Sequence, residues 1–460
     1  MNPNTGDRLI RILFISIIFL LWQNTIASAQ LLDVPLGDEL YHEVYDFIDR
    51  MVAHGYVTKV FENTRPYSRG EVAQVLMELE RKVKEDSLKL SKVEGQRLKQ
   101  LLLAFSEDLQ ALHYSTDSNV KRAHLLHLKG EKHRFGVDLG LGESVLSREQ
   151  ESTKGQTAYA TLFRPTVVGQ IQDDFAFRSD FRVYYLGAIQ FPDFPKTEAR
   201  VSQQPTKPMT AGLTTYQMKF KLPWFELAWG KENLHWGPGR HGALLISENP
   251  LPMEMIRLTA QYYPVKFQAF FSSLISEIDR KYLSGHRLEF HLKKKLRLGI
   301  AETVVYGERF DTFYLNPLQI YTITESTPKF VKERVYGSSP DNLLVSGDFS
   351  FALMENGEFY GELLIDDFRP FSFGLRSYKN WGSKFGVLLG CYYVDPLFLY
   401  DTDVRIEYAF INQYTYTHWK PITTYTHFNS VIGHQIGADA DDLWLNFRHW
   451  FSEHFALSLG

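Results

Sequence analysis

The sequence has only one cysteine, Cys391, so no disulfide bond can form within the chain. It also has little net charge: 50 Lys and Arg residues stand against 54 Asp and Glu residues, which gives no electrostatic case for binding nucleic acid. Beyond residue 30, no uncharged apolar run approaches the roughly 18 residues that a membrane-spanning helix requires, so a helical membrane protein is excluded. A chain of 460 residues without disulfide bonds must therefore be stabilised by a large core.

Motifs of familiar enzyme and metal chemistry are also missing. The sequence contains no H-E-x-x-H, C-x-x-C, Walker or G-x-S-x-G pattern. His235 and His241 flank a turn, but two histidines without a carboxylate at fixed spacing are a weak sign of a metal site. Asp366 and Asp367 are neighbours in a predicted strand and point to opposite faces, so we expect one acid in the interior and no catalytic pair. The sequence therefore predicts no catalysis, no cofactor and no metal ion.

The N-terminus has the features of a secretory signal peptide. Arg8 and Arg11 precede an apolar run from Ile12 to Trp22, and an Ala-Ser-Ala sequence at residues 27–29 supplies the small residues that a signal peptidase reads. The apolar run is too short to cross a bilayer, which disfavours a retained anchor. We therefore expect residues 1–29 to be a signal peptide and the chain to be exported.

Residues 30–125 have helical periodicity. The apolar residues between positions 40 and 52 fall on one helical face, and Gly55 stands where a left-handed C-cap is expected. An S-x-x-E sequence, the pattern of a capping box, begins at Ser68 and again at Ser91, each time before an amphipathic stretch. The pattern predicts three helices that form a small helical module.

From residue 126 to residue 460, apolar residues recur at every second position, as in β-strands, and no longer at helical spacing. Apolar and polar residues alternate in many segments, as where Phe175, Phe177, Phe181 and Val183 alternate with Arg178, Asp180 and Arg182. One clean apolar face per strand is typical of strands that face a core or a lipid bilayer. The polar face carries charges of both signs, which can pair across an interior.

Aromatic residues favour a membrane barrel over a soluble β-sandwich. Many strands begin or end in aromatic residues, among them Trp224, Trp229, Tyr262 and Trp444, as expected of girdles at the two bilayer interfaces. A soluble sandwich would instead have an aliphatic inward face and a varied polar outward face. We predict a mainly β protein: a transmembrane antiparallel β-barrel of about 16 to 18 strands, located in the outer membrane.

One segment stands out as a candidate binding site. Residues 230–240 place glycines around Trp236 and Pro238, and we expect a tight turn that displays the indole and the Arg240 guanidinium. Such groups suit a sugar, whose C–H faces stack on rings and whose hydroxyls form hydrogen bonds. The alternative, a loop folded into the lumen that constricts or plugs the barrel, is compatible with this role. The candidate polysaccharide-binding residues are Asn233, Trp236, Arg240, Asn249, Glu362 and Asp366.

A series of motifs resembles a known family along nearly the whole mature chain. In order, these motifs lie at residues 34–38, 45–50, 65–69, 236–239, 360–367 and 433–441. The most recognisable is the Trp-Gly-Pro-Gly turn at 236–239, followed by Ser247 and Asn249. In the number and order of these motifs, the chain resembles the Wzi family of capsule assembly proteins.

The resemblance implies an 18-stranded outer-membrane barrel with a periplasmic helical bundle. It also implies a non-enzymatic, lectin-like role in attaching or organising capsular polysaccharide, with outer-membrane lipid and the polysaccharide export machinery as further partners. Family members continue beyond the point that corresponds to Gly460 with a further strand or hairpin. We therefore expect a barrel that closes on its last strand, Phe455–Leu459, or one that lacks a strand or hairpin and has an open edge.

Two other functions remain open from the sequence. The charged lumen face would also suit a porin or a substrate-selective channel. An outer-membrane hydrolase would require Glu362 and Asp366 to lie about 5 to 9 Å apart beside a sugar-sized cleft.

Overall fold

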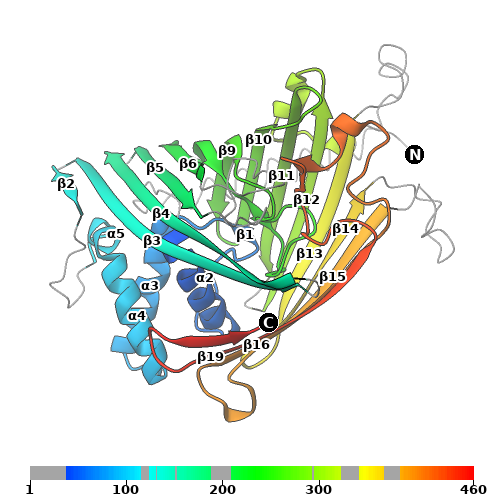
Figure 1. The fold of residues 1–460 in the computed structure, drawn as a ribbon. Helices are drawn as coiled ribbons and strands as arrows, with labels where there is room; N and C mark the ends of the chain where they lie inside the picture. Colours follow the sequence, from blue (N-terminus) through cyan, green and yellow to red (C-terminus); the bar gives the residue numbers. More distant parts are fainter. Residues whose placement is uncertain are drawn as a thin grey trace, which may run out of the picture. The chain divides into compact units, whose positions relative to one another are not determined.

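The fold is taken from a computed structural model that describes residues 38–114, 124–130, 132–150, 153–172, 174–187, 209–292, 295–322, 341–366 and 384–460 (Figure 1). The expected signal peptide, residues 1–29, lies outside these ranges. No helix within them is long and apolar enough to cross a membrane.

The N-terminal part is a helical module of α2 (Asp38–Ala53), α3 (Arg69–Lys84), α4 (Lys92–Ala104) and α5 (Ser106–Ala111). Gly55 follows α2 with a φ of +75°, as expected of a left-handed cap. Both predicted capping boxes form: the Ser68 N–H donates to Glu71 at 2.8 Å, and the Ser91 hydroxyl accepts from the Glu94 N–H at 3.0 Å. The third predicted helix is two helices, because the chain leaves helical geometry at Phe105.

Apart from a separate two-stranded sheet of β17 (Thr426–His427) and β18 (Ser430–Val431), most of the rest of the described chain forms one antiparallel sheet of 16 strands, within the predicted range. Its strands, in order, are β2 (Leu126–Lys129), β3 (His133–Gln150), β4 (Thr153–Ile171), β5 (Phe175–Leu186), β6 (Met209–Lys221), β7 (Glu226–Glu232), β9 (Met253–Tyr262), β10 (Val265–Leu274), β11 (Lys281–Leu292), β12 (Leu296–Gly307), β13 (Asn342–Met354), β14 (Gly357–Asp366), β15 (Lys384–Val394), β16 (Thr402–Ile411), β19 (Ala440–Trp450) and β20 (Ala456–Leu459). Strands that follow one another in the chain lie side by side (Figure 1). Within the described ranges, β2 and β20 are edge strands that each pair with one neighbour.

The two faces of the sheet differ as the alternation predicts. On the outward face large apolar side chains are exposed, for example Leu443 at 71% and Ile300 at 55%. On the inward face charged side chains are buried and paired: Arg287 bonds Asp348 at 2.6 Å on the second strand along. This arrangement places an apolar surface toward lipid and a paired, charged surface inside.

The aromatic residues at strand ends follow the prediction with one exception. Trp224, Trp229 and Tyr262 are exposed at 67%, 52% and 41%, as expected of girdle residues. Trp444 was expected among them, but it lies on the inward face with Asn446 and lines an interior cavity. Successive side chains of a strand point to opposite faces, so Trp444, which follows the outward-facing Leu443, points inward.

Two segments between strands fill the interior on the side of β9 to β16: the first interior segment is residues 233–252, and the second is residues 412–439. Leu234, Trp236, Leu244, Leu245 and Ile246 come from the first segment, and Tyr416, Tyr425 and Ile432 from the second. All pack with inward residues of the sheet in one apolar cluster. A short two-stranded pairing, β1 (Thr64–Arg65) with β8 (His235–Trp236), joins the first segment to the helical module.

Candidate functional site

The Trp236 side chain, expected to be displayed on a turn, is fully buried. Its indole N–H donates to the Gln268 side chain at 2.7 Å, and its ring packs edge-to-face on Phe270 with centroids 5.3 Å apart. Burying this large ring with its N–H satisfied contributes to the interior core. The expectation that the turn presents an indole to a ligand is therefore wrong, and the segment instead packs into the lumen.

The glycines of this turn allow the backbone to approach the sheet closely. Gly237 has a φ of +135°, and a Cβ at that position would lie 2.7 Å from a Glu362 carboxylate oxygen. Glu362 is 3% exposed and accepts the backbone N–H groups of Leu244 and Leu245 at 2.9 and 3.1 Å. The carboxylate thus anchors the first interior segment to β14, and it does not line the cavity described below.

Asp366 has the same role for the second interior segment. It is fully buried, accepts the Tyr416 N–H at 2.8 Å and lies 3.8 Å from the Lys384 ammonium. The prediction of one interior acid at this strand end is confirmed for Asp366, whereas Asp367 lies outside the described residues. Because backbone N–H groups occupy both Glu362 and Asp366, the structure gives no support to a pair of carboxylates that act together on a glycosidic bond.

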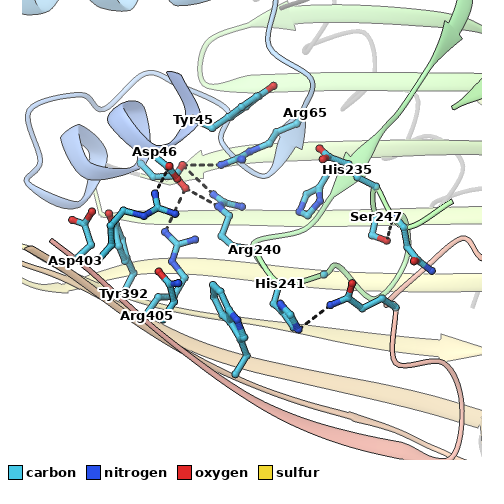
Figure 2. Close-up of a pocket in the computed structure, with 18 residues that line it drawn as sticks. Tyr45, Asp46, Arg65, His235, Arg240, His241, Ser247, Tyr392, Asp403 and Arg405 are labelled. Atoms are coloured by element: carbon cyan, nitrogen blue, oxygen red, sulfur yellow. Dashed lines mark hydrogen bonds and ion pairs between the residues drawn. The ribbon is translucent and has the colours of Figure 1, made fainter. Parts of the chain in front are cut away.

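A cavity of about 410 Å³ lies between α2, the first interior segment and strands β15, β16 and β19 (Figure 2). Of the six predicted site residues, it brings together Arg240 and Asn249. Asn233, which is half-buried just after β7, is not among its lining residues, and neither is Trp236. The predicted Arg240 guanidinium and Asn249 amide therefore line the cavity, whereas the predicted Trp236 ring does not.

The buried end of the cavity holds three guanidinium groups around one carboxylate (Figure 2). Asp49 of α2 accepts from Arg65 at 2.7 Å, from Arg240 at 2.8 Å and from Arg405 at 3.4 Å. Burial alone would raise the pKa of Asp49, but the three cations outweigh burial and hold that pKa well below its usual range. Three guanidiniums thus gather on one carboxylate, while the cavity lining as a whole is balanced, with four arginines and four acids.

Other contacts fix these guanidiniums in place. Arg405 lies over the Tyr392 ring, 4.0 Å from its centroid, and Arg65 lies 4.1 Å from the centroid of Tyr45. The Arg240 backbone N–H donates to the Glu407 carboxylate at 2.7 Å. The cationic groups are therefore held by rings and hydrogen bonds before any ligand arrives, which reduces the entropy lost on binding.

The more exposed end of the cavity carries an aromatic pair and amides. The Trp444 and His241 rings are stacked, with centroids 4.9 Å apart and planes 11° from parallel. The exposed Gln435 side chain lies 2.8 Å from His241 Nε2, and Asn249 donates to the Val431 carbonyl at 2.9 Å. Trp444 thus supplies the partly exposed aromatic ring that the sequence pattern assigned to Trp236. Its position two residues before the polar, inward-facing Asn446 on the same strand is the sequence signal that predicts an inward ring.

The two histidines of the first segment are not brought together as metal ligands. In the part of the chain that the structure describes, neither His235 nor His241 belongs to a group of three potential ligands. Burial, reinforced by Arg65 and Arg240, lowers the pKa of His235 well below its usual value, so its ring is neutral. His241 instead forms part of the ring pair with Trp444.

Comparisons with known proteins agree with this architecture. A family model described as capsule assembly protein Wzi matches residues 194–460, more than half of the chain. The solved structure of Wzi from Escherichia coli, described as an outer membrane protein involved in group 1 capsule assembly and a carbohydrate-binding β-barrel, is 15% identical with a TM-score of 0.55, over 90% of this chain and 81% of that one. A mutant porin of Rh. blastica is 11% identical with a TM-score of 0.36, over 70% of this chain and 92% of that one. No curated protein matches the sequence.

Proposed function

The chain belongs to the Wzi family of capsule assembly proteins and is a β-barrel of the outer membrane, and from this premise we propose that it binds surface polysaccharide in the cavity between α2 and β19. The Escherichia coli relative is described as carbohydrate-binding, but at 15% identity the likeness extends to the fold alone. The observation that carries the proposal is the composition of the cavity: fixed guanidiniums at one end and a partly exposed indole at the other.

These groups match the chemistry of an acidic sugar. A guanidinium binds a carboxylate or a pair of hydroxyls through two parallel hydrogen bonds, so the three guanidiniums around Asp49 suit the carboxylate of an acidic sugar. His241 covers one face of the Trp444 ring, and the partly exposed remainder of the ring offers an apolar surface for sugar C–H groups. A volume of about 410 Å³ falls within the size class of small-ligand sites, which suits a short stretch of one polysaccharide chain.

The proposal is for binding without catalysis. Among the described residues, the acids nearest the Trp236 turn are engaged by backbone N–H groups, as Glu362 is by Leu244 and Leu245. The acid at the buried end of the cavity, Asp49, is held ionised by three guanidiniums and so cannot donate a proton near neutral pH. Asp46 and Asp403 also line the cavity and pair with Arg448 and Arg50, and we propose that these charged groups serve recognition.

We also propose that the helical module faces the periplasm, where the polysaccharide export machinery could contact it. The module contacts the short connections of the sheet: His54 bonds Asn356 at 2.7 Å, Arg50 bonds Asp395 at 2.5 Å, and Ser91 bonds Asp401 at 2.5 Å. The long connections 233–252 and 412–439 leave from the opposite ends of the strands. Outer-membrane barrels have short periplasmic turns and long external loops, which supports this orientation.

A porin is the less favoured alternative. Within the described residues, the two interior segments place fully buried side chains such as Leu245 and Tyr425 across the space that β9 to β16 enclose. We expect the purified protein to give little or no steady conductance in planar bilayers. Large, stable channels would instead support a porin and would oppose a plugged binding protein.

Binding by the purified full chain in detergent tests the proposed function. We expect it to bind a uronic-acid polysaccharide such as alginate more tightly than neutral dextran, and Arg405→Gln to weaken alginate binding at least tenfold. Lys420→Gln is the control, because Lys420 pairs with Glu308 at 2.6 Å and does not line the cavity. Absence of binding to alginate and to the capsule of the source cell would oppose the proposal.

A further inference from the structure

We infer that Glu107, His124 and His127 form a binding site for one divalent transition-metal ion, with Zn²⁺ the ion that their chemistry favours. Glu107 comes from α5, His124 from the residues just before β2, and His127 from β2 itself. Their ligand atoms all lie within 4.8 Å of one another. Two imidazoles and one carboxylate form a ligand set that zinc commonly uses, with water completing the coordination.

The spacing of the ligand atoms suits a tetrahedral ion. Glu107 Oε1 lies 3.2 Å from His124 Nε2 and 3.8 Å from His127 Nε2. Zinc bonds of about 2.0–2.1 Å in tetrahedral geometry place neighbouring ligand atoms about 3.4 Å apart. The three residues also line a cavity of about 40 Å³, which is more than the roughly 10–15 Å³ that one water requires.

The orientation of the His124 ring is that of a metal-bound histidine with a carboxylate behind it. His124 Nδ1 lies 2.9 and 3.0 Å from the two oxygens of Asp138, so this nitrogen carries a proton and donates it. The other ring nitrogen, Nε2, lies 3.2 Å from Glu107 Oε1 on the side of the proposed ion. Asp138 takes the outer position that a carboxylate often occupies behind a metal-bound histidine.

The surroundings leave room and a route for the ion. A Cβ at position 136 would lie 3.3 Å from His124 Nδ1, so Gly136 provides the space for the ring. The nearby Arg69 and Arg134 both point to a different carboxylate, Asp108, at 2.7 and 3.4 Å. Arg178 also lines the cavity. The side chains of Glu107 and His127 are 23% and 33% exposed, so an ion can reach them.

A second cluster with potential ligands has no need of a metal. His54, Glu94 and Asp395 also lie together, but Arg50 donates to Glu94 at 2.6 Å and to Asp395 at 2.5 Å. A guanidinium therefore already supplies the positive charge there. At the Glu107 cluster a metal would join α5 to β2, the edge strand of the described sheet.

Calorimetric titration of the full chain in detergent with Zn²⁺ tests the site. We expect one Zn²⁺ per chain, and at least a tenfold loss of affinity in Glu107→Gln and in His124→Ala. Asp138→Asn should lose about tenfold or more, the usual effect of removing an outer partner. His113→Ala, an exposed histidine at the end of α5, should bind like the wild type.

Substitution of Co²⁺ for Zn²⁺ in the wild-type chain provides a test that does not depend on the variants folding. We expect the visible absorption bands of four-coordinate Co²⁺ with nitrogen and oxygen ligands. Absence of saturable Zn²⁺ binding, equal binding by all variants, or a purely six-coordinate Co²⁺ spectrum would each overturn the proposal. So would a His124 ring that stays protonated on both nitrogens at pH 7 with excess Zn²⁺, because it would then be only an ion-pair partner.

Discussion

The first interior segment and the inward face of β19 differ in two ways: in how distinctive their sequences are and in whether a tryptophan ring is buried or lines the cavity. The segment from Leu234 to Ile246 contains the most distinctive motif in the chain, yet its apolar side chains are fully buried, whereas the large polar side chains of Arg240 and His241 line the cavity. The strand β19 resembles any other strand of the barrel in sequence, yet Trp444, Asn446 and Arg448 line the cavity. The apolar residues of the distinctive motif build the interior, and the ordinary strand supplies the partly exposed Trp444 ring to the cavity.

The difference shows what an unusual motif reports. Glycines at positions such as Gly237 and Gly239 are required where backbone approaches backbone or a side chain closely, and a ring beside them becomes part of the core. A residue that binds a ligand must instead stay partly exposed, as Trp444 does. We expect substitutions of the buried apolar residues of the segment to change stability, and substitutions of inward residues on β19 to change binding.

The largest expected effect is on stability. Trp236→Ala removes a fully buried ring and its hydrogen bond to Gln268, and should lower the free energy of unfolding by about 3–5 kcal/mol. Trp444→Ala, the matched variant on β19, should lower it by less than about 1 kcal/mol because the ring is partly exposed. Denaturant unfolding in detergent, followed by circular dichroism, measures both. Equal losses in the two variants would break the comparison.

Acid should destabilise the interior segments. Burial, with a contribution from His241, lowers the pKa of His434 to about 4, below the ordinary value of 6.5. The unfolded chain therefore binds this proton more readily, so the stabilisation is complete above pH 6.5 and is lost as the pH falls toward 4. Between pH 8 and pH 5 we expect His434 to account for a loss of about 2 kcal/mol.

The pH dependence of unfolding in the wild type and in His434→Gln checks this. The variant should lose less stability than the wild type over the same range. Parallel curves for the two proteins would show that His434 does not titrate with folding.

Binding should depend on the Trp444 ring with little change in stability. Removing its apolar face in Trp444→Ala should weaken binding of an acidic polysaccharide about tenfold, equivalent to about 1.4 kcal/mol. Leu445→Ala is the control on the same strand, because Leu445 is 54% exposed on the outward face. Unchanged binding by Trp444→Ala would show that the Trp444 ring of β19 does not contribute to the binding site.

The smallest expected effect is at Asn249. Its amide already donates to the Val431 carbonyl, so it contributes to a ligand mainly through its oxygen. We expect Asn249→Ala to weaken binding about threefold, less than 1 kcal/mol. A larger loss than in Trp444→Ala would show that the first segment, and not β19, dominates recognition.

Local patterns explain which parts of the structure could be predicted. The alternation around Phe181 identified both faces of a strand because the side-chain period of two depends only on the strand itself. The Ser91 capping box likewise depends on four consecutive residues. These features predicted the helical module and the barrel without any knowledge of distant contacts.

The cavity depends on contacts that no local pattern contains. It brings Asp46 of α2 into an ion pair with Arg448 of β19, about 400 residues later in the chain. Whether Trp236 or Trp444 faces the cavity depends on how the interior segments fold against the sheet. The Glu107 cluster was missed for the same reason, because only an H-x-x-H sequence at His124 marks it and its third ligand comes from a different element.

The most direct test of the central claim is a structure of the protein with a bound acidic oligosaccharide, determined by crystallography or electron cryomicroscopy. We predict sugar density between Trp444 and Arg405, with a carboxylate on the guanidiniums that surround Asp49. Sugar bound only elsewhere on the barrel, with the cavity holding nothing but solvent, would contradict it.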